Sequence, residues 1–554
     1  MERYKDAQPQ DTVEHVKELL VGVGLDMQGE VRSYAGKLFS VRIADKATGF
    51  STNGKGASHD LCLASAFGEA MERLQNHYGF QNFHDDEVDE YLGFVRYPGE
   101  TARNFDCVLD ENSFVRNDMS QCFESGTDAA AQEYWRGKMG NELLLLPYYQ
   151  VGNGSIAQLP DRLISEMAGS NGLCAGNTPE EALCEGMHEL CERYVKGVIL
   201  EGEYCLPDIP RTFLDEHCPE QAEMIRVVEE SFSNSHVVVK DASLGRGLPV
   251  VCIVFIDRKS GRYHIKFGAH LRLDIALERC LTELFQGFDP RHQSLVDEAL
   301  TTWDRTSRKA IHHLENSIAM ETSDIGSIPD KILLSRPDWE FVPWGTEDFD
   351  NKAGLRVLTA KLQEIGGDVF IRDMGYLGFP AYRVYVPKVS VRFSIHGPNK
   401  DRCVRLNSRF KHKVSRAILA FERGDNASAV EYLRSTNQRQ YLCAAQEISL
   451  AEEGYSEEER DQLLAQFFGP SIARHVALCW RSKDVAAALI EQREKAAGLV
   501  SAQAESSPTN SPTNSPTNNK HTAIAALKRT LKERMVENPI DQLQIGLLYQ
   551  EGHA

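Results

Sequence analysis

The sequence predicts an α+β protein, with a mixed α/β domain over residues 1–404 and a helical domain behind it. Three observations support this fold class. Helix-type and strand-type hydrophobic patterns alternate as far as about residue 400. After residue 405 the patterns are helical, with almost no β-branched runs. A tandem repeat of Ser, Pro, Thr and Asn then separates this helical stretch from one more amphipathic segment.

The first domain mixes the two kinds of pattern along its whole length. Helical spacing of apolar residues predicts helices over 11–23, 58–77, 178–200 and 274–288. Strand character predicts strands over 38–45, 143–151, 236–243, 248–257, 263–270, 368–375 and 382–389. The strands 236–243 and 248–257 can pair around the Gly-Arg-Gly turn at 245–247.

The C-terminal part has three predicted segments. Residues 405–500 form a helical domain, in which AILAFERGDNASAVEYL resembles one tetratricopeptide-like helix pair. Residues 501–520 contain the repeat SPTNSPTNSPTN, which cannot build a core and is predicted to be a disordered linker. Residues 521–554 hold a final amphipathic helix, which could be a tethered partner-binding helix or a dispensable tail.

Composition narrows the class of protein. The chain has 554 residues and a formal net charge of −20, which disfavours direct nucleic-acid binding because such a field repels phosphates. Its 13 cysteines include no C-x-x-C pair, which indicates reduced thiols in the cytoplasm. The charged N-terminus lacks an apolar signal region, and no apolar run reaches the ~18 residues of a membrane span.

One acidic motif, E-x-x-E-R, occurs twice on predicted helices. It comprises Glu69, Glu72 and Arg73 in the first copy and Glu189, Glu192 and Arg193 in the second. The two segments align without a gap at a shift of 120 residues, and each follows a glycine-rich stretch, TNGKGAS or SNGLCAGNT. A repeated loop and helix with a polar face predicts two helices that face one site.

Neighbouring residues extend the motif. Thr178 is a good N-cap, and Glu181 stands three residues later, as in a capping box. Residues 181, 185, 189, 192 and 193 lie on one side of the same helix. A third predicted helix places Arg279, Glu283 and Gln286 on one face.

Two interpretations of these charges remain open. Glu and Arg at i,i+4 are ordinary surface ion pairs that stabilise a helix by a few tenths of a kcal/mol. If the faces converge, however, carboxylates so close together require cations, and Mg²⁺ between carboxylates and phosphates is the usual solution. The chain has no P-loop. Lys55 between Gly54 and Gly56 could assist a phosphate, or it could be an exposed turn lysine.

Taken together, these motifs resemble the YcaO family. The similarity rests on TNGKGA with S-A-x-G-E-x-x-E-R, on SNGxxAGNTxxEA with G-x-x-E-x-x-ERYVK, and on GAH with ALERCLTELFQG. The resemblance covers residues 1–400 in order and implies a fold that binds ATP and Mg²⁺. It implies four magnesium ligands, Glu69, Glu72, Glu189 and Glu192. It also implies nucleotide contacts from Lys5, Thr12, Ser65, Asn177, Glu181, Arg193, Arg279 and Glu283.

The resemblance also implies an activity. The family phosphorylates a peptide amide oxygen, which activates the backbone for attack by a nucleophile. The chain ends in LLYQEGHA, without the proline-rich tail of azoline-forming members, so it is more similar to the stand-alone bacterial branch. That branch is an accessory to β-methylthiolation of a small-subunit ribosomal protein by a methylthiotransferase. We therefore expect a protein or peptide substrate and a homodimer. A non-catalytic nucleotide-binding adaptor is the alternative, and no catalytic residue is predicted.

Overall fold

Helices and strands are mixed up to Tyr385 and give way to helices after it, which confirms the predicted α+β fold class. The computed structural model describes residues 5–78, 100–123, 127–202, 204–232, 235–257, 263–284, 332, 336–348, 350–391, 417, 420–421, 424–435, 439–468, 473, 476 and 516–550. The chain forms two compact units. The first comprises Met1–His312, Ala319–Ser394 and Asn514–Ala554, and the second comprises His313–Ile318 and Ile395–Thr513.

The helices and strands that the sequence predicts in the first unit are present near their predicted bounds, and the structure adds others. Its described helices are α1 (Pro9–Gly22), α2 (His59–Gln75), α4 (Phe105–Glu111), α5 (Ser113–Gln121), α6 (Asp128–Met139), α7 (Asp161–Ala168), α8 (Pro179–Gly202), α9 (Arg211–His217), α10 (Pro219–Ser231), α11 (Leu273–Glu283), α14 (Asn351–Gly366), α22 (Pro516–Glu537) and the 3-10 helix η3 (Gln542–Tyr549). Its described strands are β1 (Met27–Gln28), β2 (Arg32–Tyr34), β3 (Leu38–Asp45), β4 (Ser51–Gly56), β5 (Thr101–Asn104), β6 (Glu142–Gln150), β7 (Ser155–Leu159), β8 (Leu173–Ala175), β9 (Ser235–Asp241), β10 (Val250–Asp257), β11 (Tyr263–Ala269), β12 (Phe370–Asp373) and β13 (Ala381–Tyr385).

These strands form three antiparallel sheets within the described residues. In the first sheet β3 is central, with β4 on one side and β1 and β2 on the other. The second sheet has the order β11-β10-β9, and β9 pairs with β10 as predicted. The third sheet has the order β5-β6-β12-β13-β8, and β7 also pairs with β6. Strand β4 contains TNGKG, so this stretch is a strand and not the loop that its glycines predict.

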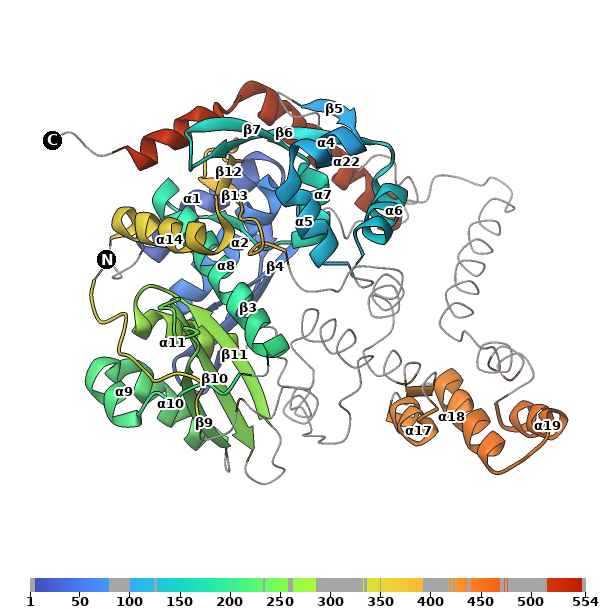
Figure 1. The fold of residues 1–554 in the computed structure, drawn as a ribbon. Coiled ribbons are helices and arrows are strands. Elements are labelled where there is room, and N and C mark those ends of the chain that lie inside the picture. Colours follow the sequence, from blue (N-terminus) through green and yellow to red (C-terminus); the bar gives the residue numbers. More distant parts are fainter. Residues whose placement is uncertain are drawn as a thin grey trace. The chain divides into compact units, whose positions relative to one another are not determined.

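Helix α8 lies between the second and third sheets (Figure 1). On one side, alternate residues of β10 such as Val250 and Cys252 share its apolar core, while Val251 and Ile253 face a separate core with α10 and α11. This alternation follows from the two-residue period of a strand. On the other side α8 packs against β8, β13 and α14. The acidic helix of the second motif is therefore the central helix of the first unit.

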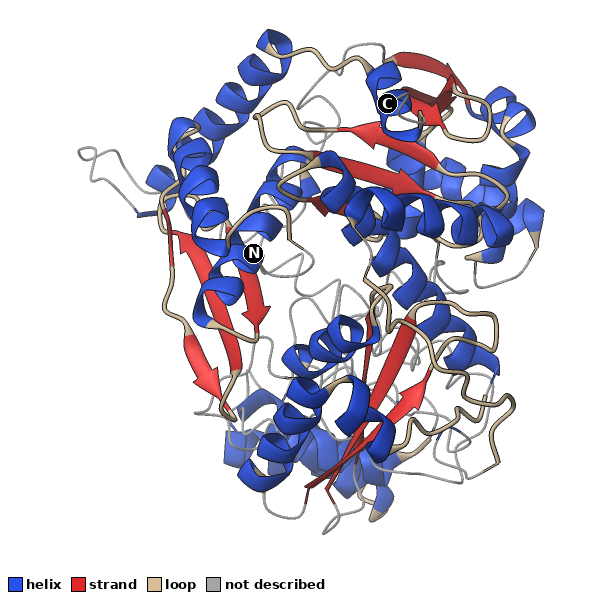
Figure 2. Ribbon diagram, turned by 90° about the vertical axis from the view of Figure 1, so that its left-hand side faces the viewer, coloured by secondary structure: helices blue, strands red, loops and turns tan. Residues whose placement is uncertain are grey.

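The other two predicted site helices also lie between sheets. Helix α2 packs on β3 and β4 of the first sheet and reaches β8 and β13 of the third. Helix α11 packs on β10 and β11 and also contacts β3 and β4. Figure 2 shows the strands in separate groups with helices packed between them. This arrangement brings α2, α8 and α11 toward one another.

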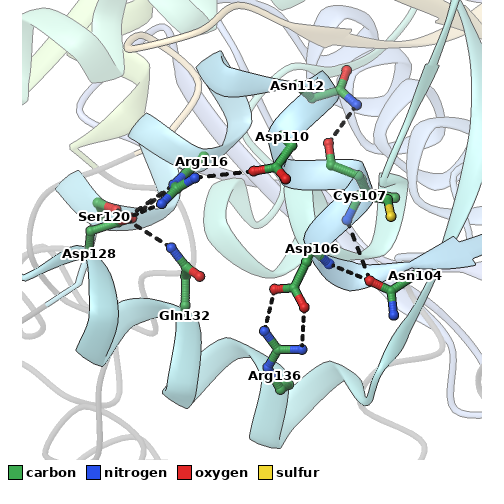
Figure 3. A network of polar contacts seen from close by, with 11 residues as sticks. Asn104, Asp106, Cys107, Asp110, Asn112, Arg116, Ser120, Asp128, Gln132 and Arg136 are labelled. Atoms are coloured by element: carbon green, nitrogen blue, oxygen red, sulfur yellow. Dashed lines mark hydrogen bonds and ion pairs between the residues drawn. The ribbon is translucent and has the colours of Figure 1, made fainter.

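Helices α4, α5 and α6 cover the face of the third sheet that is turned away from α8. Figure 3 shows polar contacts at their surface. Arg116 contacts Asp128 at 2.7 Å, and their side chains are 39% and 44% exposed. Arg136 pairs with Asp106 in the same exposed setting. Pairs of this kind contribute little to stability because water and salt screen them.

The last described segment folds back onto the first unit. Leu527, Leu531 and Met535 of α22 belong to the apolar core that α1 and α2 form. In η3, Gln542 pairs with the backbone of Asp373: its Oε1 accepts from the N–H at 2.7 Å and its Nε2 donates to the carbonyl at 3.1 Å. Helix α22 begins at Pro516, inside the range 501–520 that composition predicts as a linker. The final helix is thus an integral part of the first unit.

In the second unit, α17 (Asn426–Ser435), α18 (Arg439–Glu452) and α19 (Glu457–Phe468) share one apolar core. Consecutive helices pack against each other, and the tetratricopeptide-like assignment stays a prediction. Of the predicted ranges 405–500 and 501–520, most residues between 469 and 515 lie outside the described residues, as does Gln286. Among the helices that the structure describes, none combines the length and apolar character needed to cross a bilayer.

Candidate functional site

The two E-x-x-E-R helices begin in the same way. The Oγ of Ser58 accepts from the N–H of Leu61 at 3.2 Å, and the Oγ1 of Thr178 accepts from the N–H of Glu181 at 3.1 Å. The two capping residues are 120 positions apart in the sequence, and so are the two residues that donate to them. The Ser and Thr hydroxyls satisfy amide groups that a helix leaves unpaired in its first turn.

The glycine before each helix allows a close approach. A Cβ added at Gly56 would lie 2.6 Å from the nitrogen of Cys62, and one at Gly176 would lie 2.7 Å from the nitrogen of Ala182. These contacts again stand 120 residues apart. The glycines are therefore required where the preceding strand or turn touches the first turn of the helix. The internal repeat found in the sequence is a repeat of structure.

On α2, one arginine holds both acids of its motif. Arg73 contacts Glu69 at 3.2 Å and Glu72 at 3.3 Å. The second oxygen of Glu69 accepts from the backbone N–H of Asn53 in β4 at 3.1 Å. The side chains of Glu69 and Glu72 are 26% and 17% exposed, less than those of the surface pairs on α4–α6. The acids are therefore fixed in a partly buried position.

On α8 the corresponding arginine holds the first acid of its motif. The Nε of Arg193 lies 2.5 Å from Glu189. Burial raises the pKa of Glu192, and the negative charge of Glu189 adds to this effect, although Lys55 and Arg193 oppose it. A raised pKa indicates that Glu192 lacks enough positive charge nearby to compensate for its burial.

The acids of α2 and α8 face each other. Burial raises the pKa of Glu72 to about 8, and the carboxylates of Glu189 and Glu69 contribute to the rise against the opposing charge of Arg73. An electrostatic effect of this kind requires Glu189, on α8, to lie close to Glu72, on α2. Both helices also pack on β8 and β13, so their acids lie near one another, while their sharing of one ligand site stays a prediction.

The N-terminal segment closes one end of this surface. Glu181 is only 2% exposed, and its carboxylate accepts from the Nδ2 of Asn177 at 3.1 Å and from the backbone N–H of Asp6 at 2.9 Å. The Nζ of Lys5 lies 3.4 Å from it. Thr12 donates to the Oδ1 of Asn177 at 2.7 Å. Glu181 thus joins the N-terminal segment to α8, a role beyond that of a capping residue.

Two further ion pairs connect α11 with the other elements. Arg279 pairs with Glu185 of α8, and Glu283 pairs with Lys55 of β4. The backbone N–H of Lys55 also lies 3.5 Å from the Oγ of Ser65. Lys55 lies in strand β4 with a side chain 29% exposed, so it is not an exposed turn lysine. Burial lowers its pKa to about 8.

The predicted residues therefore form one connected set. Each contacts, or acts electrostatically on, a residue of another element, and their role as ligands stays a prediction. The sequence pattern places Glu185 on the same helix face but gives it no role in the site. In the structure Glu185 pairs with both Lys5 and Arg279. Its spacing of four residues from Glu181 and from Glu189 was the available signal.

The donor set fits Mg²⁺. Four carboxylates on α2 and α8 offer the hard oxygen ligands that this ion prefers, and a bound cation would offset the burial that raises the pKa of Glu72 and Glu192. Within the part of the chain that the structure describes, no three His, Cys, Asp or Glu side chains already stand in a metal-binding group. Glu69 and Glu189 are instead held by Arg73 and Arg193.

Fold and site together define an α+β protein in which three helices bring carboxylates and arginines to one partly buried surface. The family profile described as YcaO cyclodehydratase, ATP- and Mg²⁺-binding, matches residues 53–390. The chain belongs to the YcaO family, which confirms the resemblance of the motifs. The predicted cofactors, ATP and Mg²⁺, are those of the family.

Two proteins of known sequence are similar to the chain. An uncharacterized protein of Haemophilus influenzae is 30% identical over 400 residues, which are 70% of this chain and 65% of that protein. The ribosomal protein S12 methylthiotransferase accessory factor YcaO of Escherichia coli is 29% identical over 441 residues, which are 77% of this chain and 73% of that protein. The chain thus spans less than two thirds of the first relative.

Two solved structures show some similarity to the chain. One is a heterocyclase in complex with substrate and cofactor, with a TM-score of 0.48 and 17% identity over 70% of this chain and 52% of that chain. The other is YcaO from Methanopyrus kandleri bound with AMPPCP and Mg²⁺, with a TM-score of 0.43 and 16% identity over 70% and 92%.

Proposed function

We propose that this chain binds ATP with Mg²⁺ where α2, α8 and α11 meet, and that it activates a backbone amide of a peptide or protein by phosphorylation. The observation that carries the proposal is the convergence of the charged faces of three helices from distant parts of the sequence. Surface ion pairs do not require such convergence, nor do they raise the pKa of a glutamate to about 8. Perturbed carboxylates of this kind cluster at functional sites.

Each charged group has a role in this proposal. The carboxylates that hold Mg²⁺ are Glu69, Glu72, Glu189 and Glu192. The arginines Arg193 and Arg279 contact phosphate oxygens, for which the guanidinium group is well suited. The pocket around the nucleotide is completed by Lys5, Thr12, Ser65, Asn177, Glu181 and Glu283. ATP supplies its terminal phosphoryl group to the amide oxygen and leaves as ADP, and no side chain is assigned as a catalytic acid or base.

A more specific proposal concerns the substrate and the partner enzyme. The similarity to an accessory factor for ribosomal protein S12 methylthiolation supports a role beside a methylthiotransferase. We propose that the substrate is a backbone amide of a small-subunit ribosomal protein, and that the chain acts in the cytoplasm as a homodimer. Gel filtration with light scattering tests the dimer, and mass spectrometry of the ribosomal protein after incubation with both enzymes tests the substrate.

Thermal stability tests nucleotide binding. Saturation with Mg-ATP at about 100 times Kd stabilises a protein by about 2.7 kcal/mol, so the melting temperature should rise by several degrees. Glu192→Ala should abolish this rise because it removes a magnesium ligand. Glu216→Ala, at a 77% exposed side chain on α9, is the matched control and should keep it. An equal rise in the wild type and in Glu192→Ala would contradict the proposed site.

Phosphate release separates the enzyme from the adaptor. With Mg-ATP and its protein substrate, the enzyme should release phosphate and change the mass of the substrate. A chain that binds Mg-ATP, forms a stable complex with the methylthiotransferase and releases no phosphate above the Glu192→Ala background would instead be the non-catalytic adaptor.

A further inference from the structure

Glu185 occupies the middle of the acidic face of α8. It stands four residues after Glu181 and four before Glu189, so the three carboxylates lie on one side of the helix. The Nζ of Lys5 lies 2.7 Å from its Oε1, and the guanidinium of Arg279 pairs with its Oε2. One carboxylate therefore uses both oxygens to join the N-terminal segment, α8 and α11.

This carboxylate is held in its charged form. Burial by itself raises the pKa of Glu185, but Arg279 and Lys5 outweigh burial and hold the pKa well below its usual range. Its side chain is 23% exposed, and those of its two partners are each 25% exposed. Glu185 thus differs from Glu72, whose pKa is raised and which is short of positive charge. It is already compensated by cations of the protein, so it has no need of a metal ion.

A histidine one turn further along α8 fixes the same neighbourhood. The Nε2 of His188 accepts from the backbone N–H of Leu271 at 3.0 Å, and its ring stacks on His270 with ring centres 4.5 Å apart. Leu271 and His270 belong to the turn that leads from β11 into α11. Arg279 donates from α11 to the carbonyl of Ala269, the last residue of β11, at 3.3 Å. These contacts therefore fix the start of α11 against α8, next to Glu185.

We propose that Glu185 is a positioning residue, which holds Lys5 and Arg279 so that their charges are ready to receive the phosphates of the bound nucleotide. The inference rests on the proposed nucleotide site. Lysine and arginine side chains lose rotamer entropy when they are fixed. If Glu185 fixes them before binding, the nucleotide does not bear that cost, which is the usual benefit of preorganisation. Without Glu185, two cations from different segments would also repel each other.

The test measures nucleotide affinity apart from folding. Glu185→Gln keeps the shape of the side chain and removes its charge. By calorimetry with AMPPCP and excess Mg²⁺, we expect Kd to rise tenfold or more, with the melting temperature of the nucleotide-free protein nearly unchanged. Glu185→Asp, which keeps the charge, should recover part of the affinity. Glu180→Gln, the same change in the first turn of the same helix, should bind like the wild type.

Mg²⁺ titration and a double mutant separate this role from others. The Mg²⁺ concentration for half-maximal nucleotide binding should be unchanged in Glu185→Gln, whereas Glu192→Gln should raise it. Arg279→Gln should be impaired, and the double mutant Glu185→Gln/Arg279→Gln should lose clearly less affinity than the sum of the two single losses, because Glu185 acts in part through Arg279. An altered Mg²⁺ requirement in Glu185→Gln would make Glu185 a metal ligand, and additive losses would make it independent of Arg279; either overturns the inference.

Other outcomes are also decisive. Unchanged or tighter binding by Glu185→Gln would show that Glu185 is neutral or competes with the phosphates, and would overturn the inference. If Glu185→Gln does not fold, Glu185→Asp still tests the role, since it should lose affinity without loss of folding, and wild-type affinity would again overturn it. If the wild type does not bind Mg-AMPPCP, or Glu192→Gln binds as tightly as the wild type, the proposed function itself fails.

Discussion

Glutamate–arginine pairs occur in two settings in this chain, and their surroundings distinguish them. Arg103 and Glu111 form a pair with side chains 44% and 53% exposed, where water screens the charges. Glu189 and Arg193 are 26% and 29% exposed and lie opposite the acids of α2. Both pairs obey elementary electrostatics. Of these two pairs, only Glu189–Arg193 lies where another helix adds further carboxylates. This setting indicates a ligand site.

A buried aspartate far from the site predicts a pH dependence of stability. Asp118 is fully buried, accepts from the hydroxyl of Tyr385 at 2.7 Å, and has a pKa that burial raises to about 6. Since the folded pKa exceeds the unfolded one, its contribution to stability is fully present below about pH 4. It is lost as the pH rises through about 6, by on the order of 3 kcal/mol.

Paired melting experiments check this expectation. The difference in melting temperature between the wild type and Asp118→Asn should fall as the pH rises from about 4.5 to 7.5, because all other groups titrate alike in both proteins. A difference that stays constant over this range would show that Asp118 is charged in the fold throughout.

Helices α2 and α8 show how a repeated element builds a site. Each begins with a hydroxyl cap and rests on a glycine at the matching position, so the entry angle of both helices is set by the same local chemistry. With the entry fixed, the charged residues at matching positions are presented in the same way. The glycines of TNGKG thus position α2, and they do so from strand β4.

The glycine contact makes a prediction for α2. Gly56→Ala would place a methyl group 2.6 Å from the nitrogen of Cys62, so backbone must shift, at a cost of about 1–3 kcal/mol. The melting temperature should fall by several degrees. Gly137→Ala in α6 is the matched control: its Cβ would have open space, and it should stabilise by about 0.5–1 kcal/mol. Equal effects of the two changes would show that the close approach is not needed.

The whole chain is connected in an order that its sequence does not suggest. The second unit interrupts the first at two places in the sequence, and the segment after it returns to the core of α1 and α2. Leu531 is fully buried there, more than 450 residues after α2 in the sequence. The first unit therefore needs the C-terminal segment to complete its core, whatever the second unit binds.

Two substitutions on α22 test this return. Leu531→Ala removes a fully buried side chain and should destabilise the first unit by about 2–5 kcal/mol. Val536→Ala, at a position 70% exposed on the same helix, should change stability by less than about 0.5 kcal/mol. Urea unfolding that is monitored by the loss of nucleotide binding reports on the stability of the first unit alone. Equal stability of the two variants would show that α22 is a dispensable tail.

The sequence by itself determined the features that depend on short-range spacing. The amphipathic patterns predicted α1, α2, α8 and α11 and strands such as β3, and the shift of 120 residues predicted that two helices share a site. Motif similarity extended this to the family and its cofactors. These features are legible because helix periodicity, caps and motif order lie within a few turns of chain.

Only the tertiary structure decided which distant groups meet. It paired Glu185 with Lys5 and Arg279, residues 180 and 94 positions away. It also made β4 a strand and returned α22 to the first core. Charge and apolar character show that a side chain needs a partner, but many partners of the same chemistry exist in the sequence. The choice among them depends on how the sheets pack, which local spacing does not encode.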